Sequence, residues 1–243
     1  MVEITQAPSP NWDARRTPPD MVVLHYTGMP TGAEALARLR DPAAKVSAHY
    51  LVEEDGRVFQ LVPEARRAWH AGVSYWAGER DCNGASIGVE LVNPGLEWGY
   101  RPFPPAQVDA VCALLDAVRG RWTIPDARIL AHSDVAVTRK LDPGELFPWP
   151  ELALRGHGLW VQPPSPPGAP LEPGDEGPGV WMLQAALARL GYELVASGAF
   201  DAATAKVVSA FQRHWRPARV DGVADGETRA RLMALLRLVR GEG

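Results

Sequence analysis

Short apolar runs recur through the first two thirds of the chain and predict the strands of a sheet. Their length is typical of buried strands. Asp55-Gly56 separates two of the runs and favours a tight hairpin turn between them. The predicted strands are Met21–Tyr26, Ala48–Val52, Val58–Val62, Ser86–Val92 and Ala127–His132.

Between these runs the apolar spacing changes to that of a helix. Val108, Val111, Leu115 and Val118 fall on one face of an amphipathic helix. Residues 31–40 form a shorter helix of the same kind. Strands interleaved with helices predict an α/β domain with a central mixed sheet flanked by helices.

The last third of the chain contains an internal repeat. Gly198–Thr204 and Gly222–Thr228 share the pattern G-x-x-D-x-x-T. Asp201 and Asp225 are natural N-caps within it, and Gly191 is a natural end for the helix before it. We therefore predict a small all-α domain of three helices. Their apolar faces carry Val180, Leu183, Leu187 and Leu190, then Val207, Val208 and Phe211, then Leu232, Leu235 and Leu236.

A stretch dense in Pro and Gly, Val161–Gly179, separates the two regions. Such a composition predicts an extended linker without a core of its own, and few contacts across the boundary. The expected divisions are an N-terminal domain of residues 1–158, a linker of residues 159–178 and a C-terminal module of residues 179–243.

Composition excludes several classes of protein. The net charge of −4 argues against nucleic-acid binding, and no apolar run has the roughly 20 residues of a membrane span. No signal peptide is visible, which favours the cytoplasm slightly over the cell envelope. Cys82 and Cys112 fit no metal or redox pattern, so two free thiols are expected rather than a disulfide.

Candidate chemistry gathers where two predicted strands end. His25 and His132 each stand at the end of an apolar run, and Asp142 follows in the next loop. Two imidazoles and one carboxylate would leave a fourth zinc position open, as in catalytic zinc sites. The alternatives are hydrogen-bonded structural histidines and an aspartate that begins a Pro-Gly turn.

Glu90 and Lys140 are two further candidates. Glu90 lies within an apolar strand, where a carboxylate is costly without a partner or a function. It is a candidate general base, and the alternative is a buried ion pair. Lys140 could offer a positive charge to an oxyanion, and the alternative is a solvated loop lysine.

Five motifs in this order carry a family resemblance: "VVLHYT", "VSAHYLVEEDGRVFQLVPE", "RAWHAGVS", "CNGASIGVELVN" and "AHSDVAVTRKLDPGELFPW". From Val22 to Trp149 the chain resembles the zinc-dependent N-acetylmuramoyl-L-alanine amidases of the type-2 amidase family. The later segments "LQAALARLGY", "GAFDAATAKVVSAFQ" and "DGVADGETRARL" resemble a three-helix peptidoglycan-binding module.

The resemblance implies roles for named residues. His25, His132 and Asp142 match the zinc ligands, Glu90 matches the catalytic carboxylate, and Lys140 matches the lysine that assists at the transition state. The implied activity is hydrolysis of the amide between N-acetylmuramic acid and L-alanine. The implied partner is peptidoglycan or a soluble muropeptide, and the enzyme is expected to be a monomer. The competing hypothesis is a zinc-free recognition protein that binds the wall without cutting it.

Substrate contacts are expected from four other positions of the matched motifs: His49, His70, Arg80 and Asn83. For the two histidines a structural role is the alternative. The chain departs from the family at two places. Some relatives carry a basic residue directly before the Cys-Asn pair, where this chain has Asp81, and relatives commonly have a proline where Val137 and Thr138 stand here.

Two other histidines match no family position. His157 and His214 are therefore expected to be surface residues.

Overall fold

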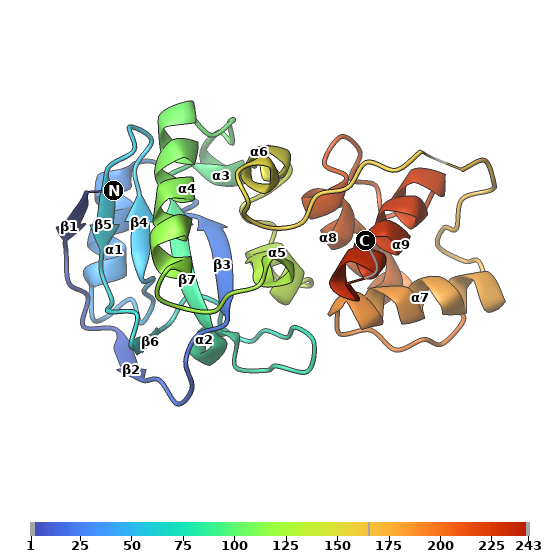
Figure 1. Ribbon diagram of the computed structural model, residues 1–243, viewed down its shortest axis with the longest axis horizontal. Coiled ribbons are helices and arrows are strands. Elements are labelled where there is room, and N and C mark those ends of the chain that lie inside the picture. The colour runs from blue at the N-terminus through green and yellow to red at the C-terminus, as the bar shows by residue number, and fades with distance from the viewer. Residues whose placement is uncertain (1–2, 165, 242–243) are drawn as a thin grey trace.

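The computed structural model describes residues 3–164 and 166–241. It contains a sheet domain followed by a helical bundle, which lie side by side along the longest axis of the molecule (Figure 1). This arrangement confirms the predicted fold class. Among the described residues, no helix combines the length and the apolar character that a membrane span requires.

The central sheet has six strands in the order β1-β5-β4-β7-β3-β8. β4, β7, β3 and β8 are mutually parallel, whereas β5 pairs antiparallel with β4 through the predicted hairpin. β1 is parallel to β5, so the sheet is mixed. The strands are β1 (Ile4–Gln6), β3 (Met21–Tyr26), β4 (Tyr50–Val52), β5 (Val58–Gln60), β7 (Ser86–Leu91) and β8 (Ile129–Ala131).

A second, small sheet and several short helices complete the N-terminal domain. β2 (Trp12–Ala14) pairs antiparallel with β6 (Arg66–Ala68). The predicted strand at residues 127–132 is shorter than expected, because a 3-10 turn (Asp126–Arg128) precedes β8 and His132 begins a helix. The short helices are α2 (Cys82–Ala85), α3 (Gly95–Trp98), α5 (His132–Val135) and α6 (Trp149–Leu154).

The two faces of the sheet are covered differently. Val22 and Leu24 of β3 belong to the core that packs against the long helix α4 (Pro105–Arg119). On the opposite face, α1 (Gly32–Arg40) packs against Leu51 of β4. Figure 1 shows α4 in front of the sheet and α1 behind it.

The C-terminal module contains the three predicted helices, α7 (Pro178–Leu190), α8 (Ala202–Trp215) and α9 (Gly226–Val239). Both repeat aspartates cap helices as expected: Asp201 accepts the Thr204 N–H at 2.8 Å, and Asp225 accepts the Thr228 N–H at 2.9 Å. Gly191 ends α7 with a φ of 146°. The apolar positions predicted for the three helices are buried.

The expectation of few contacts between the two parts is wrong. One buried cluster contains Val23, Leu130 and Val135 of the sheet domain together with Leu187 and Phe211 of the module. The linker is also partly docked, because Leu171 exchanges backbone hydrogen bonds with Ala224 of the module at 3.1 and 2.9 Å. A Pro-rich composition shows that a segment lacks its own core, but it does not show how the flanking domains pack.

The expectation that His157 and His214 are surface residues is also wrong, because their exposed fractions are 3% and 1%. His157 lies 3.3 Å from the Asp116 carboxylate, and His214 lies between the two domains. Cys82 and Cys112 are both free, as predicted, and both are buried.

Candidate active site

The candidate site lies on the sheet face that carries α1, between the areas covered by α1 and by the module. His25 of β3 is paired in register with Glu90 of β7. Paired residues of neighbouring parallel strands project from the same face of a sheet. The sequence alternation that places Val22 and Leu24 against α4 therefore places His25 and Glu90 on the opposite face.

Three side chains from different parts of the chain converge there. His25 Nδ1 lies 2.9 Å from His132 Nδ1 and 3.1 Å from Asp142 Oδ2, and His132 Nδ1 lies 2.9 Å from the same carboxylate oxygen. All three residues are buried. The structure thus brings together the three predicted ligands, which are up to 117 positions apart in the sequence.

The hydrogen bond made by His132 Nε2 shows that His132 Nδ1 faces the cluster without a proton. His132 Nε2 lies 3.2 Å from the Ala71 carbonyl oxygen, which can only accept a hydrogen bond, so Nε2 carries the proton. Nδ1 is then free to be a ligand. The backbone supports this geometry, since the Ser133 N–H donates to the Asp142 carbonyl at 2.9 Å.

A chain of hydrogen bonds orients His25 in the same way. The Ser86 hydroxyl donates to the Cys82 carbonyl, so its oxygen accepts from His70 Nε2 at 3.2 Å. His70 Nδ1 then accepts from His25 Nε2 at 3.0 Å. His25 Nδ1 is left without a proton and points at His132 and Asp142.

This arrangement fits a cation. Two imidazole lone pairs and a carboxylate oxygen face each other at hydrogen-bond distance, and neutral imidazoles would repel one another there without a positive charge between them. Two imidazoles and one carboxylate are a donor set that zinc accepts, with a fourth position left for substrate or water. The hydrogen bonds from the outer nitrogens are those expected around metal-binding histidines.

The electrostatics keep the donors in their binding states. Burial, and then the neighbouring His132, lower the pKa of His25 to about 4, so His25 is neutral at pH 7. Burial alone would raise the pKa of Asp142, but the positive charge of the His132 and His25 rings, where they are protonated in the absence of a metal, outweighs it and holds that pKa well below its usual range. Metal ligands must be deprotonated, and these groups are.

Glu90 stands beside this cluster without a partner. Its Oε2 has no hydrogen-bond partner among the described residues, and no ion pair involves Glu90 there. Burial, followed by the charge of Asp142, raises its pKa well above the usual value, although Lys140 opposes the shift. The structure therefore does not contain the buried ion pair that was the alternative.

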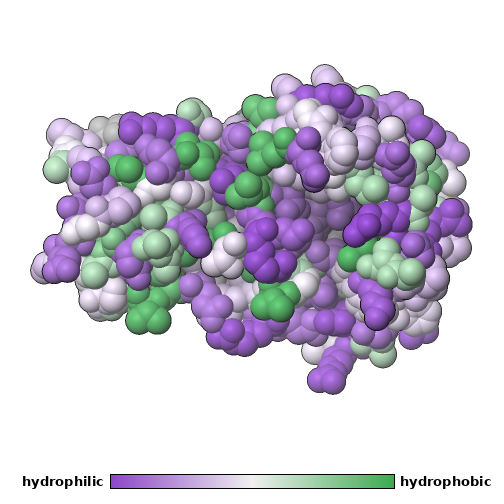
Figure 2. Space-filling model, turned by 180° about the vertical axis from the view of Figure 1, so that it is seen from behind, coloured by the Kyte–Doolittle hydropathy of each residue, from purple (hydrophilic) through white to green (hydrophobic). Residues whose placement is uncertain are grey.

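The cluster opens into a cavity of about 310 Å³. Figure 2 shows the corresponding side of the molecule, which is hollowed and largely hydrophilic over the sheet domain. Glu90, Lys140 and His70 line the cavity together with the three ligands. Sequence reasoning missed Arg38 and Trp69, which also line it. A helical pattern does not reveal which exposed residue of α1 faces a cavity.

The other predicted substrate contacts lie elsewhere. His49 is fully buried and does not line the cavity, because its Nδ1 accepts the Gly88 N–H at 2.9 Å and its Nε2 contacts Arg15 and Arg66. Arg80 is exposed and pairs with Glu193 of the module at 2.5 Å.

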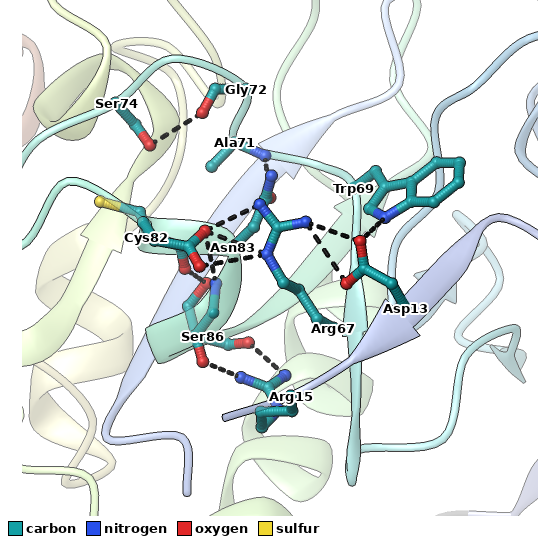
Figure 3. A network of polar contacts seen from close by, with 12 residues as sticks. Asp13, Arg15, Arg67, Trp69, Ala71, Gly72, Ser74, Cys82, Asn83 and Ser86 are labelled. Atoms are coloured by element: carbon teal, nitrogen blue, oxygen red, sulfur yellow. Dashed lines mark hydrogen bonds and ion pairs between the residues drawn. The ribbon is translucent and has the colours of Figure 1, made fainter. Parts of the chain in front are cut away.

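Asn83 is structural as well, since its Oδ1 accepts the His70 N–H at 2.9 Å. It also accepts the Ala71 N–H at 2.7 Å (Figure 3). It thereby holds the loop that carries His70. The neighbouring Asp81 caps α2 and pairs with Arg67 at 2.8 Å. Arg67 also reaches Asp13, which closes this network across β2 and β6.

Comparison with known proteins agrees with this geometry. Residues 15–145 match the family described as "N-acetylmuramoyl-L-alanine amidase". The chain belongs to this amidase family. Residues 176–232 match a second family, described as "Putative peptidoglycan binding domain". The resemblance inferred from the motifs is thus confirmed for both parts of the chain.

Individual relatives of the amidase extend the comparison. The chain is 39% identical in sequence to N-acetylmuramoyl-L-alanine amidase AmiD of Escherichia coli, over 89% of this chain and 82% of that protein. It is 35% identical to 1,6-anhydro-N-acetylmuramyl-L-alanine amidase AmpD of Enterobacter cloacae over 61% of this chain and 88% of that protein.

A solved structure of Escherichia coli AmiD, in complex with the substrate anhydro-N-acetylmuramic acid-L-Ala-D-gamma-Glu-L-Lys, superposes on the chain. Its TM-score is 0.79 at 37% identity, over 91% of this chain and 90% of that one. The likeness therefore covers the sheet domain and the module together.

Proposed function

We propose that this amidase hydrolyses the amide between N-acetylmuramic acid and L-alanine, with zinc held by His25, His132 and Asp142. The observation that carries the proposal is the convergence of three ligand atoms beside a half-buried Glu90 whose Oε2 has no hydrogen-bond partner among the described residues. The substrate named for the solved AmiD complex supports the choice of bond. It contains both the muramic acid and the L-Ala residue.

A zinc ion held by the three ligands would lower the pKa of a water molecule and polarise the scissile carbonyl. Glu90 accepts the proton of the attacking water, and its raised pKa suits that task near neutral pH. The water oxygen bonds to the carbonyl carbon, and the carbon–nitrogen bond breaks. Glu90 passes its proton to the leaving nitrogen, which becomes the amino group of L-alanine.

Lys140 lines the same cavity and supplies the remaining charge. Its ammonium group can donate to the carbonyl oxygen as negative charge develops on it. His70 acts indirectly, because its Nδ1 accepts a hydrogen bond from His25 Nε2 and so orients the His25 ring. All of these groups belong to one chain, which supports a monomeric enzyme. Light scattering on the purified protein tests that point.

Product analysis tests the proposed function directly. Mass spectrometry should show free stem peptide and intact glycan when the enzyme is incubated with soluble anhydro-muropeptide. A chelator should abolish the reaction and added zinc should restore it. Binding of muropeptide without cleavage, by a preparation that takes up no added zinc, would favour the recognition-protein hypothesis instead.

The module is proposed to hold the enzyme on polymeric peptidoglycan, which supports action on the wall as well as on soluble fragments. An apolar groove of about 510 Å³ runs between α7 and α9 and is lined by Trp181, Met182 and Met233, all exposed. Trp181→Ala should reduce activity on insoluble sacculi more than activity on soluble muropeptide. An equal loss on both substrates would remove the groove from substrate binding.

A further inference from the structure

The module touches the segment that carries a metal ligand. His132 is the first residue of α5, and Asp134 is its third. The Asp134 carboxylate accepts the Ala131 N–H at 2.9 Å, so it is tied to the backbone directly before His132. Asp134 is 1% exposed. A buried carboxylate in this position needs further donors.

Those donors come from the module. Tyr192, which follows α7, donates its hydroxyl to Asp134 Oδ1 at 2.7 Å. His214 of α8 contacts Asp134 Oδ2 through Nδ1 at 2.6 Å. Both module residues are almost completely buried. We call Asp134, Tyr192 and His214 the clasp.

Aromatic stacking fixes the His214 ring within the clasp. The ring lies between Trp149 of α6 and Trp215 of α8, with centroid distances of 3.6 and 3.7 Å. One neighbour therefore belongs to each domain. Leu130, which precedes α5, and Val135, its last residue, are also buried against the module core. Figure 1 shows α5 and α6 as the elements of the sheet domain nearest to α8.

We infer that the module is a structural part of the metal centre, and that Tyr192 and His214 are positioning residues for His132. The inference rests on the proposed role of His132 as a ligand. Without the module, Asp134 would keep one backbone donor and the apolar side of α5 would face water. α5 also sets the ligand spacing, because the Ser133 N–H donates to the Asp142 carbonyl. Movement of α5 would therefore separate two ligands.

The test uses the full-length protein with Tyr192→Phe, which removes only the hydroxyl, and with His214→Ala. The matched control is Thr204→Val, because the Thr204 hydroxyl is buried and, among the described residues, bonds only to Gln184 and Asp201 of the module. Zinc affinity is measured by competition with a chromogenic chelator. Partners behind a metal ligand typically change metal affinity by about 10–100-fold. We expect about a tenfold loss in both clasp variants and no loss in the control.

Hydrogen exchange of the zinc-free protein provides a readout that does not depend on metal. The Ser133 and Ala136 amides should exchange faster in the clasp variants than in the wild type. Their exchange rates should be unchanged in Thr204→Val. Unchanged exchange and unchanged zinc affinity in Tyr192→Phe would overturn the inference, even if its melting temperature fell. Failure of the wild-type protein to bind zinc, with faster exchange in the clasp variants, would instead overturn the proposed metal function alone.

Discussion

His25 and Glu90 are directly paired residues of neighbouring parallel strands, yet only the His25 side chain has hydrogen-bond partners among the described residues. His25 contacts His70, His132 and Asp142 at 2.9 to 3.1 Å. Glu90 leaves Oε2 without a hydrogen bond. Glu90 is half-buried, and a carboxylate oxygen withdrawn from water without a partner destabilises the fold, so its presence beside a ligand cluster points to chemistry.

Glu90→Gln separates the two roles that a buried carboxylate can have. The amide keeps the shape of the side chain but cannot accept a proton. Turnover should fall by about 10²–10⁴-fold, the usual contribution of a general base, while zinc content stays unchanged. Turnover, bound zinc and melting temperature are measured on one preparation. Near-normal turnover would remove Glu90 from the mechanism.

Loss of a ligand should act on zinc first. Asp142→Ala leaves two protein ligands, which is too few to hold the ion firmly. The purified wild-type protein should contain about one zinc per chain, and Asp142→Ala should lose it or bind it far more weakly. Atomic absorption on both proteins measures this. Full occupancy and normal activity in His25→Ala would contradict the ligand assignment.

The sequence pattern was sufficient for the elements that bear the site. Apolar runs and helical spacing locate β3, β7 and α4, because strands and helices bury one face or both in a regular order. The ordered motifs then identify His25, Glu90, His132 and Asp142. These residues could be found because their chemistry depends on residue type, and residue type is visible in a sequence.

Sequence reasoning missed contacts between residues that are far apart in the chain. His214 reads as an ordinary residue of an amphipathic helix, and nothing in its local pattern shows that Asp134 lies against it. His49 and Asn83 sit in matched motifs but support the backbone behind the cavity. Arg38 lines the cavity from a helix whose exposed residues look alike in the sequence. Such placements depend on how elements pack, which periodicity does not specify.

The zinc-free enzyme should lose stability in mild acid. Burial is the first cause that lowers the pKa of His25 to about 4, of His49 to about 3 and of His70 well below its usual value. The unfolded chain therefore binds more protons as the pH falls from about 6.5 toward 4, and stability declines in that window. Each extra proton contributes about 1.4 kcal/mol per pH unit.

Glu90 opposes this trend. Because its pKa is raised in the folded state, the folded protein binds this proton at a higher pH than the unfolded chain does, which adds stability as the pH falls. Three imidazoles outnumber that single carboxylate. Denaturant unfolding at several pH values measures the slope. His49→Gln should flatten the decline, and Glu90→Gln should steepen it. A constant free energy of unfolding between pH 6.5 and 4 would contradict the neutral state of these buried imidazoles.

Arg38 should act on substrate affinity. Arg38 lines the cavity, and its guanidinium has no partner among the described residues. The peptide stem of a muropeptide carries carboxylates, and an exposed ion pair contributes up to about 1 kcal/mol. Arg38→Gln should therefore raise KM about two- to fivefold and leave kcat unchanged. Arg40→Gln, on the same helix but outside the cavity, is the control. Equal KM values for both variants would exclude Arg38 from binding.

Gly88 provides the space that His70 occupies beneath the ligand cluster. A Cβ at position 88 would lie 2.7 Å from His70 Nδ1 and closer still to Cγ and Cδ2. Gly88→Ala should therefore displace the His70 ring and break its hydrogen bonds to His25 and Ser86. Overpacking of this kind typically costs about 1–3 kcal/mol. Zinc affinity should also fall by about tenfold, because His25 loses the partner of its outer nitrogen.

A double variant shows whether the clash with His70 is the cause. In the Gly88→Ala background, His70→Ala removes the ring that the new methyl group meets, so the double variant should be more stable than the sum of the two single losses predicts. Its zinc affinity should stay low, since the hydrogen bond to His25 is still absent. Gly179→Ala, where a Cβ would meet only Leu171 at 3.7 Å, is the control and should melt like the wild type. Additive losses in the double variant would mean that Gly88 acts through another contact than His70.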